Sequence, residues 1–333
     1  MKALTFQRYG KSPEIGFAHV PRPVLKPNEM LVEVHAAGIN PIDNMIPTGI
    51  FKPVLKFQLP AVMGSDLAGV VAEVGSNVTR FKVGDAIFAN VFDQGIGSIA
   101  EFVAVPEGAA APKPTNLDFV QAASIPMVGL TSWQALKERA NLQPGQKVFI
   151  PAGSGGVGSF AIQLAKYLGA KVATSTSTAN VQLVNSLGAD EVIDYTNQAF
   201  EDVLTGYDLV LGTLRGDTIE KSVGILKPGG KIISLVGPLD KAFARARRLN
   251  VFLGFVFGLM SRKVMRLASK EGVEYSFLFV RPEGGQLSEI GKLLESERIR
   301  PVIDKVFAFE HAKEALEYLA KGRAKGKVVI KIK

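Results

Sequence analysis

Cysteine is absent from the 333-residue chain, and histidine occurs only three times. The lack of cysteine excludes disulfide bonds, thiolate zinc sites and a cysteine nucleophile. His19, His35 and His311 lie far apart in the sequence, so we interpret each as an ordinary surface or core residue and expect no metal site. The apolar fraction of 47% and the charged fraction of 21% are typical of a globular protein, and the length allows two domains.

Long apolar runs are also missing. Residues 1–8 lack the apolar core of a secretory signal and have the pattern of a first strand, so we expect a cytoplasmic location. The apolar run at 251–260 is too short to cross a bilayer as a helix, so we expect no membrane span. It lies within 241–270, where eight basic residues and no acidic one account for the whole net charge of +8. We expect this segment to be buried in the protein or in a dimer, or else to contact a membrane surface weakly.

Acidic residues are also missing from the stretch 139–189, which contains a glycine motif. Residues 148–150 suit a buried parallel strand, and apolar residues with helical spacing follow the glycines. Gly153, Gly155 and Gly158 have the G-x-G-x-x-G spacing of a dinucleotide-binding turn, although a glycine loop can also join two elements for steric reasons alone. The lysine and hydroxyl of a P-loop are absent, which disfavours nucleotide hydrolysis. We expect the turn and the following helix to bind a pyrophosphate through Ser154, Gly155, Gly156, Val157 and Gly158.

The absence of acidic residues also bears on the choice of cofactor. NAD-binding versions of this motif place an acidic residue about twenty positions on, at the end of the second strand, where it binds the adenosine ribose. Here that strand, at 171–174, leads into a run of hydroxyl side chains from Thr174 to Thr178. We therefore expect NADPH, with Ser175 and Thr176 beside its 2′-phosphate. The alternative is that the hydroxyl run is simply a solvated turn.

The pattern of expected elements changes near residue 118. The first hundred residues contain short strand-like runs separated by Gly, Pro and Asn, which indicates a small β-rich domain. Strands and helices then alternate, which predicts a parallel α/β sheet. We expect helices at 118–139, 158–168, 283–297 and 309–321, and strands at 147–150, 171–174, 191–193, 208–211, 231–236, 275–280 and 326–333.

Several spaced motifs resemble one known group of enzymes. The runs AAGINPID, VMGSDLAGVVAEVGSNVTRFKVGDAIFA, AGSGGVG, LGADEVIDY, LKPGGKIISLVG and GKVVI together resemble the medium-chain dehydrogenase/reductase superfamily, and within it the zinc-free quinone oxidoreductases and the enone (alkenal) reductases. The resemblance implies a homodimer whose α/β chain has a GroES-like β-rich catalytic domain at 1–120 and 266–333. It also implies a Rossmann domain with a doubly wound parallel sheet at 121–265. Asn40 and Ser65 occupy the positions of the zinc ligands in the zinc-dependent branch, which implies zinc-independent chemistry.

The resemblance further implies catalytic residues. Asn40 and Asp43 would lie near the nicotinamide, where Asn40 would orient the ring or the substrate carbonyl; the alternative is that Asn40 and Pro41 only shape a turn. Relatives place tyrosines shortly after this motif, whereas this chain has Met45 and Phe51. Lys52 is then the candidate proton donor to a developing enolate, or else an ordinary solvated lysine.

Cofactor contacts are implied in the same way. Thr131 would contact the nicotinamide ribose or amide, and Tyr195 would lie beside the 2′-phosphate, or would be a core aromatic residue. Four residues follow predicted strands at the sheet edge where open α/β folds bind ligands: Gly212, Thr213, Val236 and Gly237. The residues expected to line the nicotinamide pocket, or to form a plain buried strand, are Phe277, Leu278 and Phe279.

The expected activity is hydride transfer from NADPH to an electron-poor acceptor, because such an acceptor needs no metal to polarise it. A small-molecule quinone or an α,β-unsaturated carbonyl fits that requirement. The alternative is an NADPH-binding, redox-responsive interaction protein with little turnover. Nucleic-acid binding is not expected, because no aromatic platform or known reader motif accompanies the basic residues.

Overall fold

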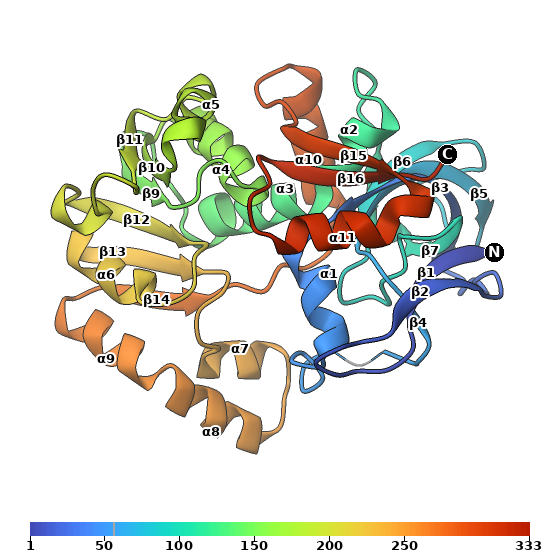
Figure 1. Ribbon diagram of the computed structural model, residues 1–333, viewed down its shortest axis with the longest axis horizontal. Helices are drawn as coiled ribbons and strands as arrows, with labels where there is room; N and C mark the ends of the chain where they lie inside the picture. The colour runs from blue at the N-terminus through green and yellow to red at the C-terminus, as the bar shows by residue number, and fades with distance from the viewer. Residues whose placement is uncertain (56) are drawn as a thin grey trace. The chain divides into compact units, whose positions relative to one another are not determined.

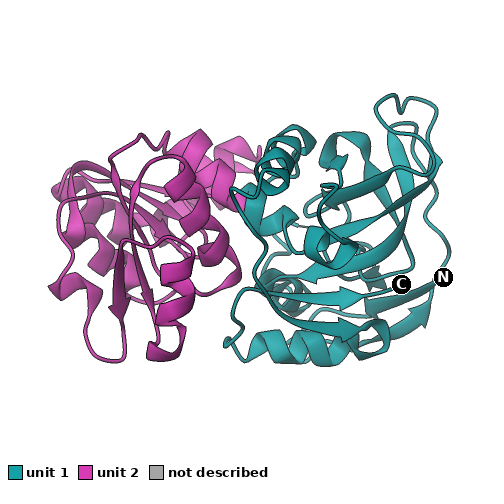
Figure 2. Cartoon of the chain, turned by 90° about the horizontal axis from the view of Figure 1, so that it is seen from above, with its two compact units in different colours: residues 1–130, 281–333 teal, residues 131–280 magenta. Residues whose placement is uncertain are grey.

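The computed structural model describes residues 1–55 and 57–333. It contains two compact units, one formed by residues 1–130 together with 281–333 and the other by residues 131–280 (Figure 2). The first unit is therefore built from both ends of the chain. The second unit is a single continuous segment.

The second unit contains a six-stranded parallel sheet with the order β11-β10-β9-β12-β13-β14 (Figure 1). This is the strand order of a Rossmann fold, so the predicted doubly wound parallel sheet is confirmed. Its elements are β9 (Lys147–Ile150), α4 (Gly156–Tyr167), β10 (Lys171–Thr176), η4 (Thr178–Asn180), α5 (Val181–Ser186), β11 (Glu191–Asp194), η5 (Phe200–Asp202), β12 (Tyr207–Gly212), α6 (Thr218–Ile225), β13 (Leu226–Ser234), α7 (Lys241–Ala246), α8 (Val251–Met260), α9 (Arg262–Lys270) and β14 (Glu274–Phe277).

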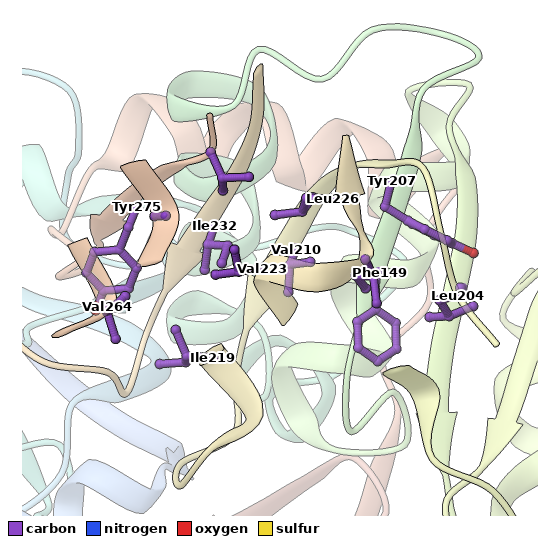
Figure 3. Packing of buried hydrophobic residues seen from close by; sticks show 14 of the residues in the cluster. Phe149, Leu204, Tyr207, Val210, Ile219, Val223, Leu226, Ile232, Val264 and Tyr275 are labelled. Carbon is purple, nitrogen blue, oxygen red and sulfur yellow. The ribbon is translucent and has the colours of Figure 1, made fainter. Parts of the chain in front are cut away.

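A buried cluster on one face of this sheet holds the unit together. Phe149 of β9, Val210 of β12 and Ile232 of β13 meet Val223 of α6 and Val264 of α9 (Figure 3). Strands that are covered by helices need apolar side chains on both faces, which explains the nearly continuous apolar runs in β9, β12 and β13. Because Val264 belongs to this cluster, α9 is anchored to the sheet.

The first unit contains a three-stranded sheet, β2-β1-β4, and a larger sheet with the order β15-β16-β3-β5-β6-β8, in which β7 also pairs with β3. This arrangement confirms the predicted β-rich domain. Its strands are β1 (Lys2–Phe6), β2 (Ile15–His19), β3 (Glu29–Ile39), β4 (Ala61–Val62), β5 (Asp66–Val74), β6 (Ala86–Asn90), β7 (Phe102–Pro106), β8 (Ala110–Pro112), β15 (Ile303–Ala308) and β16 (Lys327–Lys331). Its helices are α1 (Pro41–Met45), η1 (Ile46–Thr48), η2 (Glu107–Ala109), α2 (Phe119–Ala123), α10 (Gly284–Glu295), η6 (Phe309–His311) and α11 (Ala312–Ala320).

The last strand of the chain completes the sheet that the first part of the chain begins. β16 pairs antiparallel with β3, with Val328 opposite Ile39, and β3 pairs antiparallel with β5, with Gly38 opposite Asp66. The ends of these three strands therefore lie beside one another. This pairing brings residues from three distant parts of the sequence to one place.

The structure differs from the predicted boundaries at two points. The units divide after Leu130 and after Val280, rather than at 120 and 265, because β14 adds to the edge of the second unit's sheet beside β13. The helix predicted at 118–139 is broken into α2, α3 (Pro126–Trp133) and a π-helical turn, η3 (Gln134–Arg139). The break falls at a proline, which has no backbone N–H to continue the helical hydrogen bonds.

Candidate functional site

The second unit has a topological switch point at β9. The chain runs from β9 to β10 and β11 on one side of the sheet, and then returns to place β12, β13 and β14 on the other side of β9. The connections on the two sides of β9 leave the sheet in opposite directions, which opens a crevice at the carboxyl ends of the strands. The glycine turn follows β9 directly, so it lies at this switch point.

The three glycines of the turn have different surroundings. A Cβ on Gly153 would lie 2.0 Å from Thr174 Oγ1, and one on Gly158 would lie 2.4 Å from the carbonyl oxygen of Ala152. A Cβ on Gly155 would meet only the Ala152 carbonyl oxygen, at 3.4 Å. Gly153 and Gly158 are thus required for packing within the protein, whereas Gly155 is required only if something outside the protein approaches it closely.

The glycine turn leads directly into a helix. Gly155 is the N-cap of α4, and Ser154, Gly155, Gly156 and Val157 are each partly exposed. The first N–H groups of a helix have no partner within the helix and attract anions. Ser154, Gly155, Gly156 and Val157 therefore form one continuous surface at the start of α4. Gly158, the fifth predicted pyrophosphate residue, is buried, and its contact with a pyrophosphate stays a prediction.

The hydroxyl run after β10 is only partly directed outward. Ser175 and Thr176 are buried, and their hydroxyl groups contact the glycine turn: the Ala152 N–H donates to Ser175 Oγ at 3.4 Å, and Thr176 Oγ1 donates to Ser154 Oγ at 3.0 Å. These two side chains support the turn from within, and their contact with an adenosine 2′-phosphate stays a prediction. Ser177 and Thr178, which follow, are the residues that reach the surface.

Asn180 is a further polar residue at this edge, and the sequence reasoning missed it. Its amide nitrogen donates to Ser154 Oγ at 3.3 Å and to Ser177 Oγ at 3.2 Å. Its Oδ1 is buried and has no hydrogen-bond partner among residues 1–55 and 57–333. A buried acceptor without a donor is costly, so this atom favours a ligand that brings a hydroxyl or N–H group to it.

A carboxylate stands at the end of the neighbouring strand. Asp194 ends β11 directly opposite Thr176 and accepts hydrogen bonds from the side chains of Thr178, Thr196 and Asn197 at 2.6–2.8 Å. These bonds, above all those from Thr178 and Thr196, hold the pKa of Asp194 below its usual range. Tyr195, the next residue, is 63% exposed, so the interpretation of it as a core aromatic was wrong.

The ends of β12 and β13 also reach this sheet edge. Thr213 Oγ1 donates to the carbonyl oxygen of Pro151 at 2.7 Å, which ties the end of β12, with Gly212, to the glycine turn. Beyond β13, the N–H groups of Val236 and Gly237 donate to Ser234 Oγ at 3.4 and 2.8 Å. The structure thus brings these predicted cofactor residues to the carboxyl edge of one sheet.

The remaining predicted cofactor residues lie in α3 and after β14. Thr131 is buried in α3. Phe277 and Leu278 are buried as well, and Phe277 and Phe279 both pack against Phe243 of α7, with ring centroids 5.4 and 5.5 Å apart. This packing shows a buried strand end; a contact of these residues with a nicotinamide stays a prediction.

The first unit contains a buried polar cluster that sequence analysis found only in part. Lys327 at the start of β16 donates from Nζ to Asn40 Oδ1 at 2.5 Å, to the Ile39 carbonyl oxygen at 3.0 Å and to Asp66 Oδ2 at 3.2 Å. The amide of Asn40 also donates to Asp66 Oδ2 at 3.0 Å. Asp66 Oδ1 accepts from Asn90 Nδ2 and from the Met127 N–H, each at 2.8 Å. We call the group the polar cluster; its members are Asn40, Asp43, Ser65, Asp66, Asn90 and Lys327.

Asp43 is the second carboxylate of this cluster. Its Oδ2 accepts from the Asn40 N–H at 2.7 Å, and its Oδ1 accepts from Ser65 Oγ at 3.0 Å. Burial raises the pKa of Asp43 to about 7, with a smaller contribution from the neighbouring Asp66 charge, and its two hydrogen bonds and Lys327 offset part of this rise. Asp43 therefore changes its protonation near neutral pH.

The predicted catalytic residues differ in their exposure to solvent. Asn40 and Asp43 are only 4% and 2% exposed, and both are hydrogen-bonded within the cluster. Lys52 is exposed, with its Nζ 4.8 Å from the ring centroid of Tyr9. Asn40 and Asp43 are thus placed to hold neighbouring groups in position, whereas Lys52 is accessible to a small molecule.

Two residues of the cluster, Asn40 and Ser65, are those that stand at the expected zinc-ligand positions. Among residues 1–55 and 57–333, no three His, Cys, Asp or Glu side chains are grouped so that they could hold a metal ion. His19 and His311 are exposed, and His35 is partly buried beside Glu33. The histidines are therefore scattered, as predicted.

Comparisons with known proteins agree with this architecture. A family model described as an alcohol dehydrogenase GroES-like domain matches residues 26–115, and one described as a zinc-binding dehydrogenase matches residues 187–330. The chain belongs to the medium-chain dehydrogenase/reductase superfamily. One of the two matching models is described as a zinc-binding dehydrogenase, whereas this superfamily member contains no cysteine.

Several relatives of this superfamily member are named as oxidoreductases. It is 34% identical to the zebrafish (Danio rerio) mitochondrial NAD(P)H oxidoreductase RTN4IP1, over 100% of this chain and 91% of the relative. It is 35% identical to the chloroplastic NADPH-dependent alkenal/one oxidoreductase of Arabidopsis thaliana, over 99% of this chain and 79% of the relative. The solved quinone oxidoreductase of Coxiella burnetii is 31% identical, with a TM-score of 0.85 over 100% of this chain and 99% of that one.

The residues of the second unit fit a nicotinamide dinucleotide. Gly155 leaves room for a ligand at a place where a side chain would otherwise be tolerated, and Asn180 Oδ1 has no partner within the described residues. Ser154, Gly155, Gly156 and Val157 would hold the pyrophosphate, and Ser177 and Asn180 would lie toward the adenosine. The superfamily membership comes from the comparisons, whereas the fit to a dinucleotide comes from the geometry of the second unit. The two are therefore independent observations.

Proposed function

We propose that this superfamily member uses NADPH to reduce a small quinone or the activated C=C bond of an α,β-unsaturated carbonyl compound, without a metal ion. The observation that carries the proposal is the glycine turn at the switch point of the parallel sheet, with Gly155 open to a ligand. Relatives that are named as a quinone oxidoreductase and as an alkenal/one oxidoreductase support the substrate classes.

The bound cofactor would supply the hydride, and the protein must supply orientation and a proton. An acceptor of this kind is already electron-poor, so the hydride can add to it without a metal ion to polarise the carbonyl. One proton then completes the two-electron reduction, either at the α-carbon or at the oxygen. We assign this proton to Lys52 Nζ, because Lys52 is the exposed member of the predicted catalytic set.

The polar cluster would act through position and not by contact with the acceptor. Lys327 and Asp66 hold both ends of the Asn40 amide, and Asp43 holds the Asn40 N–H. The turn between β3 and α1 is thereby fixed in one conformation. We infer that Asn40, Asp43 and Lys327 are positioning residues for the loop that leads to Lys52.

The preference for NADPH is proposed on the absence of a carboxylate at the end of β10. Asp194 at the end of β11 opposes this preference, since it carries a charge, but three side-chain donors already engage its oxygens. Ser177→Asp tests the assignment at a partly exposed position. It should weaken NADPH binding far more than NADH binding, and an equal loss for both cofactors would place the 2′-phosphate elsewhere.

The proposed function is tested with two glycine variants and a panel of acceptors. Gly155→Ala should keep the wild-type melting temperature and lose NADPH affinity, because its Cβ occupies the space for the pyrophosphate and not space within the fold. Gly158→Ala should lower the melting temperature, because its Cβ would lie 2.4 Å from a backbone oxygen. NADPH binding is measured by the fluorescence of the reduced nicotinamide.

Turnover is then followed as loss of NADPH absorbance with quinones and enones. If Gly155→Ala binds NADPH as the wild type does, the assigned site is wrong. If the wild type binds NADPH but reduces no acceptor above the blank rate, the chain is instead an NADPH-binding interaction protein. The homodimer and the cytoplasmic location stay predictions.

A further inference from the structure

The segment 241–270 leaves an apolar helix face uncovered. On α8 the exposed fractions are 92% for Val251, 71% for Phe252, 58% for Phe255 and 53% for Leu259. Phe257 is the one residue of α8 that is buried. Burial of this run within the protein, one of the outcomes expected from the sequence, was therefore wrong.

These exposed residues form one stripe. An α-helix turns by about 100° per residue, so Val251, Phe252, Phe255 and Leu259 all fall within one sector of about 100°. Phe257, which packs against Phe243 of α7, points to the opposite side. The outward face of α8 is therefore apolar along its whole length.

The helix continues into α9 with the same outward face. The Ser261 N–H donates to the Phe257 carbonyl oxygen at 3.0 Å, and the Met265 N–H donates to the Ser261 carbonyl oxygen at 2.9 Å, so helical bonding passes through the junction. Figure 1 shows α8 and α9 following one another, with α7 beside α8. At about 100° per residue, Arg262 and Arg266 lie in the same outward sector as the apolar stripe.

Exposed basic side chains lie near both ends of α8 along the chain. Arg245 and Arg248 precede α8, and Arg262 and Arg266 follow it, and all four are exposed. Lys263 is paired with Glu220 at 3.1 Å and Lys270 with Glu271 at 3.7 Å. The segment itself contains no acidic residue, so its surface is apolar in the middle and positive on either side.

We propose that this face binds the surface of an anionic lipid bilayer, with the α8 stripe in the headgroup region and the flanking arginines on lipid phosphates. The positive charge of this face favours an anionic lipid surface over a second copy of the chain. A two-fold interface places the same patch against itself, so each basic flank would face a basic flank, which is unfavourable. An anionic lipid surface complements both the charge and the apolar stripe.

The mode of binding is peripheral. Among the described residues no helix is long and apolar enough to span a membrane. α9 is held in the core of the second unit by Val264 and Ala268, so the stripe reaches a bilayer only as far as its side chains extend. The binding should therefore be reversible and should weaken at high salt, which screens the arginine contribution.

The test measures flotation with phosphatidylcholine vesicles that contain or lack phosphatidylglycerol. Wild-type protein should bind only the vesicles with phosphatidylglycerol. Phe252→Ser/Phe255→Ser and Arg262→Ser/Arg266→Ser should each lower the partition coefficient about tenfold or more, since each removes at least about 1.4 kcal/mol of apolar or electrostatic attraction. Val24→Ser/Val83→Ser and Arg8→Ser/Lys11→Ser, at exposed positions of the first unit, are the matched controls and should bind as the wild type does.

Melting temperatures and sedimentation velocity accompany each variant. An unchanged melting temperature shows that the loss of binding is not unfolding. If Phe252→Ser/Phe255→Ser changes the oligomeric state of the protein, the stripe is an interface between copies and the proposal is wrong. The proposal also fails if wild type ignores both kinds of vesicle, or if the arginine variant alone loses binding, because the patch would then be a simple polyanion site.

Discussion

Asp43→Asn isolates the ionisation of the buried carboxylate. The variant keeps the shape of the side chain, and its amide can accept from the Asn40 N–H and donate to Ser65 Oγ, whose hydroxyl can reverse its role. The only large loss is the titrating group. Because burial raises the pKa of Asp43 from 3.8 to about 7, the folded protein holds this proton more tightly than the unfolded chain does.

The sign and size of the effect follow from that shift. Between about pH 5 and about pH 7 the unfolded chain has released the proton and the folded chain still retains it, so the free energy of unfolding falls by about 1.4 kcal/mol per pH unit. Above the folded pKa both states are ionised and the loss stops. From about pH 5 to about pH 8 the wild type should lose about 2–3 kcal/mol more stability than Asp43→Asn.

The assay is urea unfolding followed by far-UV circular dichroism at several pH values, with wild type and variant compared at each. Asp190→Asn is the matched control. Although burial raises the pKa of Asp190, hydrogen bonds from Lys166 and Val172 hold it below its usual value, so it stays ionised in both states over this range. Its stability difference from wild type should not change with pH. Parallel pH profiles for wild type and Asp43→Asn would refute the assignment of this titration to Asp43.

Substitutions at four other positions test the buried ion pair, two glycines and the proposed proton donor. Lys327→Met should cost about 3–5 kcal/mol of stability in urea unfolding, because it leaves the fully buried Asp66 without its cation; a loss below about 1 kcal/mol would show that Asp66 is compensated elsewhere. Gly237→Ala should lower the melting temperature, since its Cβ would lie within 2.6 Å of three side-chain atoms. Gly224→Ala in α6 should instead raise the free energy of unfolding by about 0.5–1 kcal/mol, because its Cβ would have nothing within 4 Å. Lys52→Met should lower kcat for an enone with NADPH affinity unchanged, and Lys52→Arg should not restore it, because a guanidinium does not release its proton; unchanged kcat in Lys52→Met would exclude Lys52 as the proton donor.

The parts of the fold that follow from local chemistry could be predicted from the sequence. Gly158 is needed because a side chain would meet Ala152 and Gly153 of the same turn, and Gly153 is needed because a side chain would meet Thr174 of the next strand. The glycine spacing alone reveals both requirements. The alternation of apolar strands and helices likewise gives the parallel sheet, because each strand must be covered on both faces. These signals are contained within about thirty residues each.

The direction of individual side chains and the pairing of distant strands could not be predicted from the sequence. Ser175 and Thr176 were expected to face an adenosine, but a strand alternates its side chains and the pattern of five consecutive hydroxyl residues does not say which of them turn inward. Lys327 lies 287 residues from Asn40 and is followed by Lys331 and Lys333, which resemble it in the sequence but are exposed. Only the pairing of β16 with β3 distinguishes the buried lysine from the other two.

The charges of the polar cluster couple the protonation of Asp43 to Lys327. Lys327 and Asp66 form a buried pair whose charges cancel, so an ionised Asp43 would leave one uncompensated negative charge among buried atoms. A proton on Asp43 removes that excess; burial is the main cause of the raised pKa of Asp43, and the Asp66 charge is a smaller one. With Asp43 protonated, the cluster therefore holds the β3–α1 turn through a nearly neutral set of hydrogen bonds. A chain with asparagine and serine at the expected zinc-ligand positions can in this way keep the turn rigid with a cation from its own last strand.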